Sequence, residues 1–317
     1  MQEVQLLVSL GNIFINEDPG KIISRIASSD PPYRALEIGF GNGEFLEHLA
    51  STFSRGVIFG IEVSLQCTSR AVKRIQRSGL ENTRIIMGDA RFILGKCFPP
   101  EWLHAVYMNF PCPWPKNRHA KRRVTYSGFS DVLAGSLAME GTFEIFTDDP
   151  DYAREVAEEL PSHPALFLES SILNPEREIR TKYERKWREQ GKDLFLLRFR
   201  KKEPFFNVAQ KKEEKEVHAF LEALCPDFSD MNRLSGVEGG SSSTRWVFRE
   251  SFMGPSGVIL LEAITSDEGF RQTFFFRIIP RGEGCLVKVD SPSRPFKTEA
   301  VSLAFASLLN FLKGDER

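Results

Sequence analysis

Residues 36–45 read LEIGFGNGEF, a short apolar run followed by glycines at alternate positions, Gly39, Gly41 and Gly43. Glycine adopts backbone conformations with positive φ, so such a run lets the chain turn sharply and approach a ligand closely. The next segment, 44–53, has helical spacing, and the N-terminus of a helix beside the loop favours an anionic group. The stretch therefore predicts a strand, a ligand-binding loop and a helix.

Further apolar runs with helical segments between them follow this unit. The expected strands are 56–63, 82–90, 102–110, 141–149 and, later, 194–202. The expected helices are 65–79, 127–139 and 150–160, with a short one near 20–28. Strands that alternate with helices are typical of βαβ units. We therefore expect an α/β fold in which helices cover both faces of a mostly parallel sheet.

The pattern changes after about residue 202. The charged segment 203–216 contains Pro204 and is expected to be a linker. The strand-like runs beyond it are 243–251, 257–265, 270–280 and 284–290, and a helix near 296–313 closes the chain. Consecutive strands before one helix predict a small α+β domain. The expected divisions are an N-terminal segment 1–32, an α/β domain 33–202, the linker, and a C-terminal domain 217–317 of unassigned role.

Composition limits the classes of function. The 42 Lys and Arg residues nearly balance the 43 Asp and Glu residues, so a nucleic-acid surface would have to be a local patch. The five cysteines form no CxxC pair, so neither a disulfide framework nor a metal site is expected. No apolar stretch approaches about 18 residues, and no basic region precedes the apolar run at the N-terminus. We expect a cytoplasmic protein without a membrane span, either a monomer or a homodimer.

Carboxylates stand on three of the predicted strands. Glu62 ends the second strand about 20 residues past the loop, where a carboxylate can accept hydrogen bonds from both ribose hydroxyls of a nucleoside. Asp89 can reach an adenine amino group, and Glu37 can face an ammonium or sulfonium group. Each carboxylate could instead cap the following helix. Glu44 replaces the last glycine of a dinucleotide fingerprint, which favours S-adenosylmethionine (SAM) over NAD.

The stretch NFPCPWPKNRHAKRRVTY (109–126) follows the fourth predicted strand, where ligands bind in open α/β sheets. Its three prolines stiffen the loop, and Trp114 offers a face for stacking. Positive charge is concentrated in Lys116, Arg118, His119, Lys121, Arg122 and Arg123. A stiff, aromatic and basic loop suits an RNA contact beside a methyl donor. A solvated surface is the alternative for the basic run.

The run PWPKNRHAKRR (113–123), with LEIGFGNGEF upstream, resembles the bacterial tRNA (guanine-N7-)-methyltransferase family, a group of class I SAM-dependent methyltransferases. TDDPDYA (147–153) and NPEREIRTKYERKW (174–187) resemble the remaining motifs of the family, so the resemblance spans about 33–200. It implies a Rossmann-like fold and formation of N7-methylguanosine at position 46 in the variable loop of tRNA, with SAM as methyl donor and tRNA as partner.

Site residues are assigned from the loop, the strand ends and this resemblance together. The expected SAM site consists of Glu37, Gly39, Gly41, Gly43, Glu62, Asp89 and Cys112. The expected tRNA site consists of Lys116, Arg118, His119, Arg122, Asp148, Thr181, Lys182, Tyr183 and Glu184. Cys112 and Asp148 are the candidate catalytic residues.

Cys112 departs from the family, which usually has aspartate there, in an Asp-Pro-Trp-Pro-Lys motif. Guanine N7 carries a lone pair and no proton, so its methylation needs no general base. The enzyme mainly has to align the nucleophile, methyl group and sulfur, and to stabilise the charge that moves onto the base. We expect activity to survive the replacement, with Asp148 or Glu184 supplying negative charge near the base.

Two other functions stay open. A cysteine at position 112 could attack C6 of a pyrimidine, as in cytosine-C5 methyltransferases, if Lys116 and Arg118 stabilise its thiolate. The chain could also be a non-catalytic RNA-binding protein on a methyltransferase fold.

Two later segments carry the remaining expectations. Asp149 precedes Pro150 and is expected to cap the next helix, which leaves Asp148 to accept hydrogen bonds from the guanine edge. The stretch 176–187 is either a salt-bridged helical face or, at 181–184, a loop that closes over the guanine. In the second case Tyr183 would stack on the base and Glu184 would read its edge.

Overall fold

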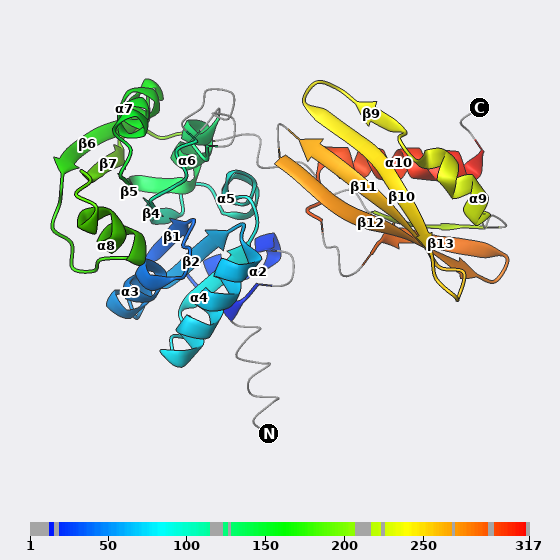
Figure 1. The fold of residues 1–317 in the computed structure, drawn as a ribbon, viewed down its shortest axis with the longest axis horizontal. Coiled ribbons are helices and arrows are strands. Elements are labelled where there is room, and N and C mark those ends of the chain that lie inside the picture. Colours follow the sequence, from blue (N-terminus) through cyan, green and yellow to red (C-terminus); the bar gives the residue numbers. More distant parts are fainter. Residues whose placement is uncertain are drawn as a thin grey trace. The chain divides into compact units, whose positions relative to one another are not determined.

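The computed structural model describes residues 13–15, 19–114, 123–125, 128–206, 217–222, 226–267, 270–290 and 295–314 (Figure 1). The chain divides into two compact units, Met1–Lys211 and Lys212–Arg317. This division falls within the segment 203–216 that we expect to be a linker, of which 207–216 lie outside the described residues.

A seven-stranded sheet forms the centre of the first unit. Its order is β3-β2-β1-β4-β5-β7-β6. The strands are β1 (Arg34–Ile38), β2 (Val57–Glu62), β3 (Thr83–Met87), β4 (Leu103–Asn109), β5 (Leu137–Thr147), β6 (Leu166–Leu173) and β7 (Phe195–Lys201). Strands β1 to β5 pair in parallel, and β7 runs antiparallel to both β5 and β6. The prediction of a Rossmann-like, mostly parallel sheet is confirmed.

Helices cover both faces of this sheet. They are α2 (Pro19–Ala27), α3 (Glu44–Thr52), α4 (Leu65–Arg77), α5 (Ala90–Cys97), α6 (Phe129–Ser136), α7 (Pro150–Glu159) and α8 (Lys182–Glu189). Successive residues of β2 face different layers: Ile58 is buried in the cluster that includes α3 and α4, whereas the Phe59 ring lies 5.1 Å from that of Phe98, just after α5. Burial on both faces explains why β2 reads as a continuous apolar run.

The structure differs from the expected elements of this unit in three places. Helix α6 ends at Ser136 and β5 begins at once, so the strand starts four residues earlier than expected. Helix α5 and strand β6 were not predicted. Strand β6 is largely exposed beyond its first residue, with Phe167 60% and Leu173 57% accessible, so it lacks the buried apolar run that reveals the inner strands.

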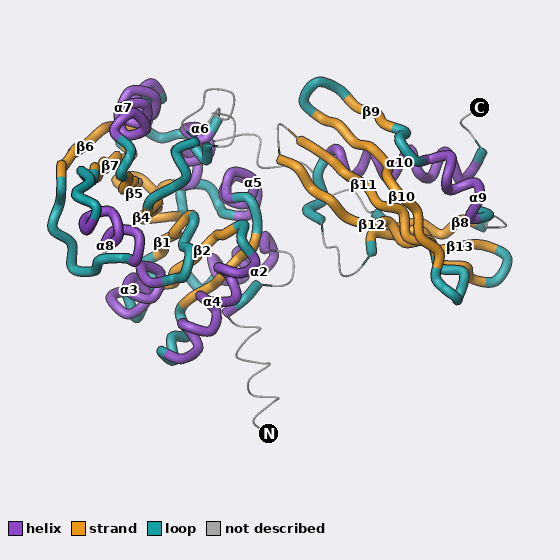
Figure 2. Tube along the Cα trace, in the orientation of Figure 1, coloured by secondary structure: helices purple, strands orange, loops and turns teal. Residues whose placement is uncertain are grey.

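The second unit contains a six-stranded antiparallel sheet with the order β8-β13-β12-β11-β10-β9. Its strands are β8 (His218–Leu221), β9 (Glu238–Gly240), β10 (Thr244–Met253), β11 (Ile259–Asp267), β12 (Phe270–Arg281) and β13 (Gly284–Val289). The short helices α9 (Phe228–Met231) and η4 (Asn232–Leu234) precede β9, and α10 (Glu299–Lys313) follows β13 and packs on β10 and β11 (Figure 2). The expected α+β region is present.

Phenylalanine accounts for much of the core of the second unit. Phe248, Phe274 and Phe276 point from the sheet into one cluster with Phe305 of α10. The rings of Phe274 and Phe276 are 5.0 Å apart in an edge-to-face arrangement, which suits dense aromatic packing. In neither unit is a described helix long and apolar enough to cross a membrane.

Candidate active site

The glycine loop connects β1 to α3, with φ of +70° at Gly39, +54° at Gly41 and +77° at Gly43. L-residues with side chains are strained at such angles, which explains the three glycines. A Cβ on Gly43 would lie only 2.8 Å from the Cβ of Ala71, so this glycine also permits α3 and α4 to approach closely. Gly39 and Gly41 line a cavity, whereas Gly43 does not. Contact of these glycines with SAM stays a prediction; the cavity supports it for Gly39 and Gly41 and gives no support for Gly43, which directly precedes α3.

The cavity has a volume of about 450 Å³ and lies at the carboxyl ends of β1, β2 and β4 and beside the residues that follow β3. The chain order across the sheet reverses between β1 and β4, and ligands bind at such switch points in open α/β sheets. The lining brings together most of the expected donor residues and part of the expected tRNA site. These are Glu37, Gly39, Gly41, Glu62, Asp89, Cys112, Thr181, Lys182 and Tyr183.

Glu62 is held rigidly at the end of β2. Its Oε2 accepts a hydrogen bond from the backbone N–H of Gly41 at 3.1 Å, and its Oε1 accepts from Val63 at 2.9 Å and Ser64 at 3.0 Å. These bonds tie the carboxylate to the glycine loop and leave lone pairs for a ligand. Such an oriented carboxylate in a cavity can accept two hydrogen bonds from a ribose.

Glu37 is buried in β1, with 2% of its surface accessible. Its Oε1 accepts from the side-chain amide of Asn109 at 3.1 Å, while Oε2 is buried and has no hydrogen-bond partner among the described residues. Burial raises the pKa of Glu37 to about 8, and the nearby Glu62 adds to that rise. A buried carboxylate oxygen without a partner is costly unless a ligand completes it. The ammonium group of SAM fits this requirement.

Asp89 caps the helix that follows it, which is the alternative to a ligand contact, although it also lines the cavity. Its Oδ1 accepts from the backbone N–H of Arg91 at 2.9 Å and so caps α5, and its Oδ2 lies 2.6 Å from the Arg91 guanidinium. A contact from Asp89 to an adenine amino group would have to use the lone pairs that these bonds leave. Asp89 therefore has a structural role that is independent of any ligand.

The segment after β4 carries Cys112 and Trp114 to the cavity. The thiol is exposed, and Trp114 has a φ of +43°. Arg123 anchors the segment: its Nε donates to the carbonyl of Pro113 at 2.6 Å and its Nη2 to that of Trp114 at 3.2 Å. The same guanidinium pairs with Glu155. Arg123 is thus a buried structural residue, which corrects its inclusion among the RNA-facing cations.

The other expected tRNA contacts of this segment are not covered by the structure. Lys116, Arg118, His119, Lys121 and Arg122 lie outside the described residues. Their roles stay predictions from the sequence.

Thr181 is the N-cap of α8: its side-chain hydroxyl oxygen accepts a hydrogen bond from the backbone N–H of Glu184 at 3.4 Å. The expectation of a loop at 181–184 is therefore wrong, and the helical alternative for 176–187 is confirmed from Lys182 onward, whereas 176–181 is not helical. The cavity is still lined by Thr181, Lys182 and Tyr183, and Tyr183 is half-exposed. Glu44 of α3 accepts from the backbone N–H of Lys182 at 2.6 Å, which fixes the start of α8 beside the glycine loop.

Glu184 faces the protein interior and is fully buried. It pairs with Arg188 at 3.0 Å and Arg177 at 3.8 Å. This position does not support the expectation that Glu184 reads the base edge, because the side chain is used to hold α8. The guanidinium of Arg177 lies between the rings of Phe45 at 4.8 Å and Phe146 at 4.7 Å.

Arg177 is a residue of this site that the sequence did not indicate. It donates to the side-chain oxygen of Asn109 at 3.0 Å, and the amide of Asn109 in turn donates to Glu37. A polar chain therefore runs from Glu37 in the cavity to α8. No local pattern distinguishes Arg177 from the charged residues around it, since its partners come from other elements.

Asp148 follows β5 and pairs with Lys192, outside the lining of the cavity. In the structure it is therefore not brought together with the other candidate catalytic residue, Cys112. Asp149 caps α7 by accepting from the N–H of Tyr152 at 2.9 Å, as predicted. Among the described residues, no group of three or more His, Cys, Asp or Glu side chains is placed to hold a metal ion.

Comparisons with known proteins agree with this geometry. Residues 33–197 match the family model described as a putative methyltransferase. The chain is 36% identical over 268 residues to a tRNA (guanine-N(7)-)-methyltransferase of Thermotoga maritima, covering 84% of this chain and 85% of that protein. It is 31% identical over 280 residues to the enzyme of the same name from Thermus thermophilus, covering 88% of each.

A third relative of the same name, from Nitrosococcus oceani, is 37% identical over 168 residues, 53% of this chain and 71% of that protein. The two longer matches exceed the 211 residues of the first unit, so they include part of the second unit.

Proposed function

The chain belongs to the tRNA (guanine-N7-)-methyltransferase family, and from this premise we propose that it uses SAM to methylate N7 of the guanosine at position 46 of tRNA. The observation that carries the proposal is the unpartnered, buried Oε2 of Glu37 in a cavity at the switch point of the sheet. A cationic nucleoside fits both carboxylates of this cavity: its ammonium group pairs with Glu37, and its sugar bonds to the oriented carboxylate of Glu62.

The donor site follows from these contacts. Glu37 binds the ammonium group, Glu62 accepts hydrogen bonds from the ribose hydroxyls, and Asp89 lies where it can accept from the adenine amine. When bound, SAM supplies an electrophilic methyl group on a sulfonium. Gly39 and Gly41 contribute by their lack of side chains, which lets the loop backbone approach the donor.

The acceptor needs positioning more than proton transfer. Guanine N7 attacks with its lone pair, and charge moves from sulfur to the base without any proton being removed. Thr181, Tyr183 and Trp114 line the same cavity as the donor residues, and in this proposal they hold the base in line with the methyl group. Alignment is therefore the main contribution of the chain, and the aspartate that Cys112 replaces is not needed as a base.

The cavity position of Cys112 favours one second candidate. An exposed thiol beside a methyl donor can act as the nucleophile of a cytosine-C5 methyltransferase. That reaction proceeds through a covalent bond from Sγ to C6 of the base, so it stops when the sulfur is removed.

The test is transfer of tritium from methyl-labelled SAM to unmodified tRNA, followed by nucleoside analysis. We expect N7-methylguanosine, and no transfer to a tRNA with adenosine at position 46. 5-Methylcytidine would establish the second candidate, and tRNA binding without any transfer would indicate a non-catalytic RNA-binding protein.

Glu62→Ala is expected to weaken SAM binding by about tenfold or more, since it removes hydrogen bonds to a charged group. A tRNA substrate also implies a cytoplasmic protein.

A further inference from the structure

Helix α4 carries four cationic side chains along one face. They are Arg70, Lys73, Arg74 and Arg77, which we call the α4 stripe. Their spacing of i, i+3, i+4 and i+7 places them on one side of the helix, while Ala71, Val72 and Ile75 are buried on the other. The stripe is about 10 Å long, a length over which a nucleic-acid strand carries several phosphates.

Most of the charge on the stripe is not neutralised. Arg74 is tied down, since it donates to the carbonyl of Asn42 at 3.1 Å and to Glu47 at 2.9 Å. Arg70, Lys73 and Arg77 are exposed, and none of them forms an ion pair with a described carboxylate. With Asn42, Glu47 and Ser78, the four cations line a groove of about 480 Å³. An exposed groove with an excess of positive charge suits a polyanion.

The groove adjoins the candidate active site. Asn42 lines both the groove and the cavity. Arg74 reaches Glu44 at 3.9 Å, and Glu44 in turn holds the N-terminus of α8 and pairs with Arg185 at 3.3 Å. The stripe and α8 are therefore joined through one carboxylate at the edge of the cavity.

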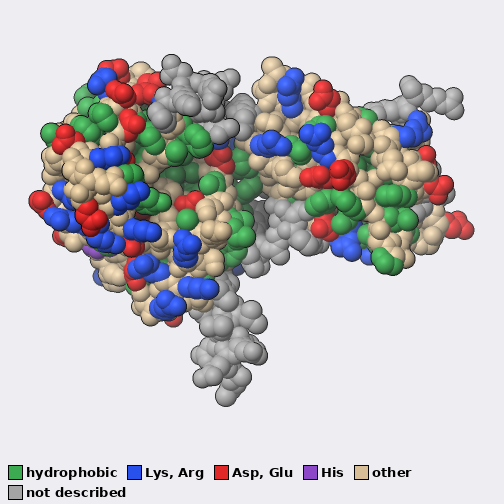
Figure 3. All heavy atoms as spheres, in the orientation of Figure 1, with side chains coloured by type: hydrophobic (Ala, Val, Ile, Leu, Met, Phe, Trp, Pro, Cys, Tyr) green, Lys and Arg blue, Asp and Glu red, His purple; other side chains and the backbone are tan. Residues whose placement is uncertain are grey.

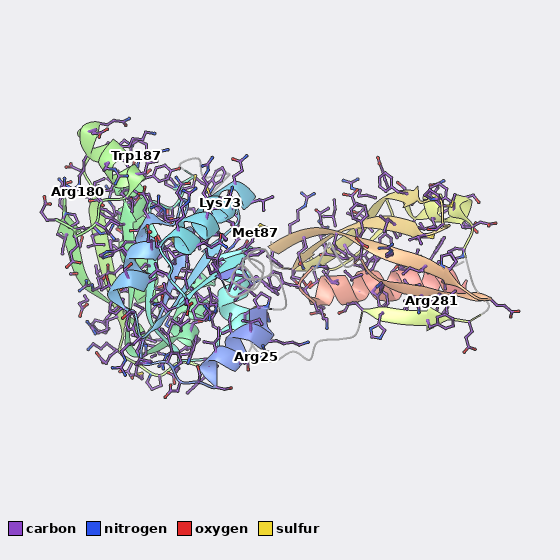
Figure 4. All side chains as sticks on the ribbon, turned by 90° about the horizontal axis from the view of Figure 1, so that it is seen from below. Arg25, Lys73, Met87, Arg180, Trp187 and Arg281 are labelled. Carbon is purple, nitrogen blue, oxygen red and sulfur yellow. The ribbon has the colours of Figure 1, made fainter. Side chains whose placement is uncertain are left out.

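The same face of the first unit is rich in cations. Figure 3 shows Lys and Arg side chains gathered over α8, α3 and α4. In Figure 4, Lys73 lies on the same side of the unit as Arg180 and Trp187, whereas Arg25 of α2 lies on the opposite side. A polyanion bound at the start of α8 can therefore continue over the stripe without crossing the unit.

We propose that the α4 stripe binds the sugar–phosphate backbone of the tRNA at a distance from the methylated nucleotide. The inference rests on the proposed function for the identity of the RNA. Phosphate contacts position a nucleic acid without reading its sequence. Among the described residues, the groove is lined by four cations, one carboxylate (Glu47) that pairs with Arg74, and two small polar groups, with no aromatic side chain on which a base could stack. The stripe orients the tRNA so that its variable loop enters the cavity.

Two double variants test this proposal. Lys73→Gln/Arg77→Gln removes two charges from the stripe, and Lys21→Gln/Arg25→Gln removes two exposed charges from α2 as a matched control. Binding of unmodified tRNA is measured across a range of salt concentrations. We expect the stripe variant to bind about fivefold or more weakly at low salt, with the slope of log K against log salt reduced by about 1 to 2. SAM affinity and melting temperature are expected to stay at wild-type values in both variants.

Equal tRNA affinity in the wild type and the stripe variant would overturn the proposal, as would an equal loss in the α2 control. Tritium transfer by the wild type separates this result from the proposed function. If the wild type binds tRNA through the stripe but transfers no methyl group, the enzymatic function fails and the binding surface stands. If the wild type methylates tRNA and the stripe variant binds like the control, only the stripe is refuted.

Discussion

Glu37 combines two properties that conflict in a protein without a ligand: it is a carboxylate, and it is almost wholly buried. Burial raises its pKa to about 8, so it is mostly protonated at neutral pH in the free protein. A cationic donor requires the ionised form. Binding SAM should therefore release a proton at pH 7, and Glu37 should link donor affinity to pH.

The sign of this linkage gives a prediction. Below pH 8 the free protein must lose a proton before it binds, so affinity for SAM should rise as pH rises from 6 to 8, by up to about tenfold per unit, and level off above pH 8. Calorimetry at pH 6, 7, 8 and 9 measures it. Glu37→Gln should bind SAM more weakly and show only the pH dependence of the donor's own groups. Identical pH profiles for the two proteins would contradict the assignment.

The thiol of Cys112 stands where the family usually has a carboxylate. Cys112→Asp restores the residue usual in the family and should preserve or raise the rate of tRNA methylation, because it adds a carboxylate near the developing positive charge. Cys112→Ala should retain activity within about tenfold of the wild type. Single-turnover transfer to unmodified tRNA measures both. Complete loss of transfer in both variants would point to thiol chemistry.

At the scale of elements, α8 is held on the sheet by side chains from several strands and helices. Arg177 stacks between Phe45 and Phe146, bonds to Asn109 and approaches the buried Glu184. Glu44 holds the first turn of α8 from α3. The residues that face the acceptor are thus placed by contacts distant in the sequence.

Arg177→Met should therefore destabilise the protein by about 3 kcal/mol, because it removes one partner of a buried ion pair. Denaturant unfolding measures this loss, and the KM for SAM should rise as well, because Arg177 holds Asn109 beside Glu37 and its charge lowers the pKa of that carboxyl. Arg180→Met is the control: Arg180 lies in the same segment but is exposed, and among the described carboxylates it pairs with Glu176 alone. Its effect on stability should stay within about 0.5 kcal/mol. A similar loss of stability in both variants would remove the special role of Arg177.

At the scale of the whole molecule, the residues of the cavity all lie between 37 and 183, within the first unit. The second unit has its own sheet and its own Phe-rich core. Residues 1–206 should therefore fold alone and bind SAM with an affinity within about twofold of the full chain. Calorimetry and thermal unfolding of the truncated protein check this, and failure to bind SAM while folded would show that the donor site depends on the second unit.

The order of strands and helices could be read from the sequence wherever burial on both sides of a strand produced a long apolar run. This holds for β1 to β4. The exposed strand β6 has no such run and was not predicted, and the short helix α5 was not predicted either. Glu37, Gly39, Gly41, Glu62 and Cys112 could likewise be assigned to the cavity, since strand ends of a parallel sheet meet at one edge. Gly43, Glu184 and Asp148 were expected in the site and lie outside its lining.

By itself, the sequence determined the glycine loop, the carboxylates at the strand ends, the α/β class and the resemblance to a family, because these depend on local patterns of backbone freedom and burial. Only the tertiary structure decided which charges act on ligands and which hold the fold. Arg123 and Glu184 were expected at the RNA contact and are buried anchors, and Arg177, which no pattern in the sequence singled out, is largely buried beside Glu184. Arg70, Lys73 and Arg77 remain exposed. The physical reason is that the state of a charged side chain depends on its desolvation and its partners, which come from distant parts of the chain.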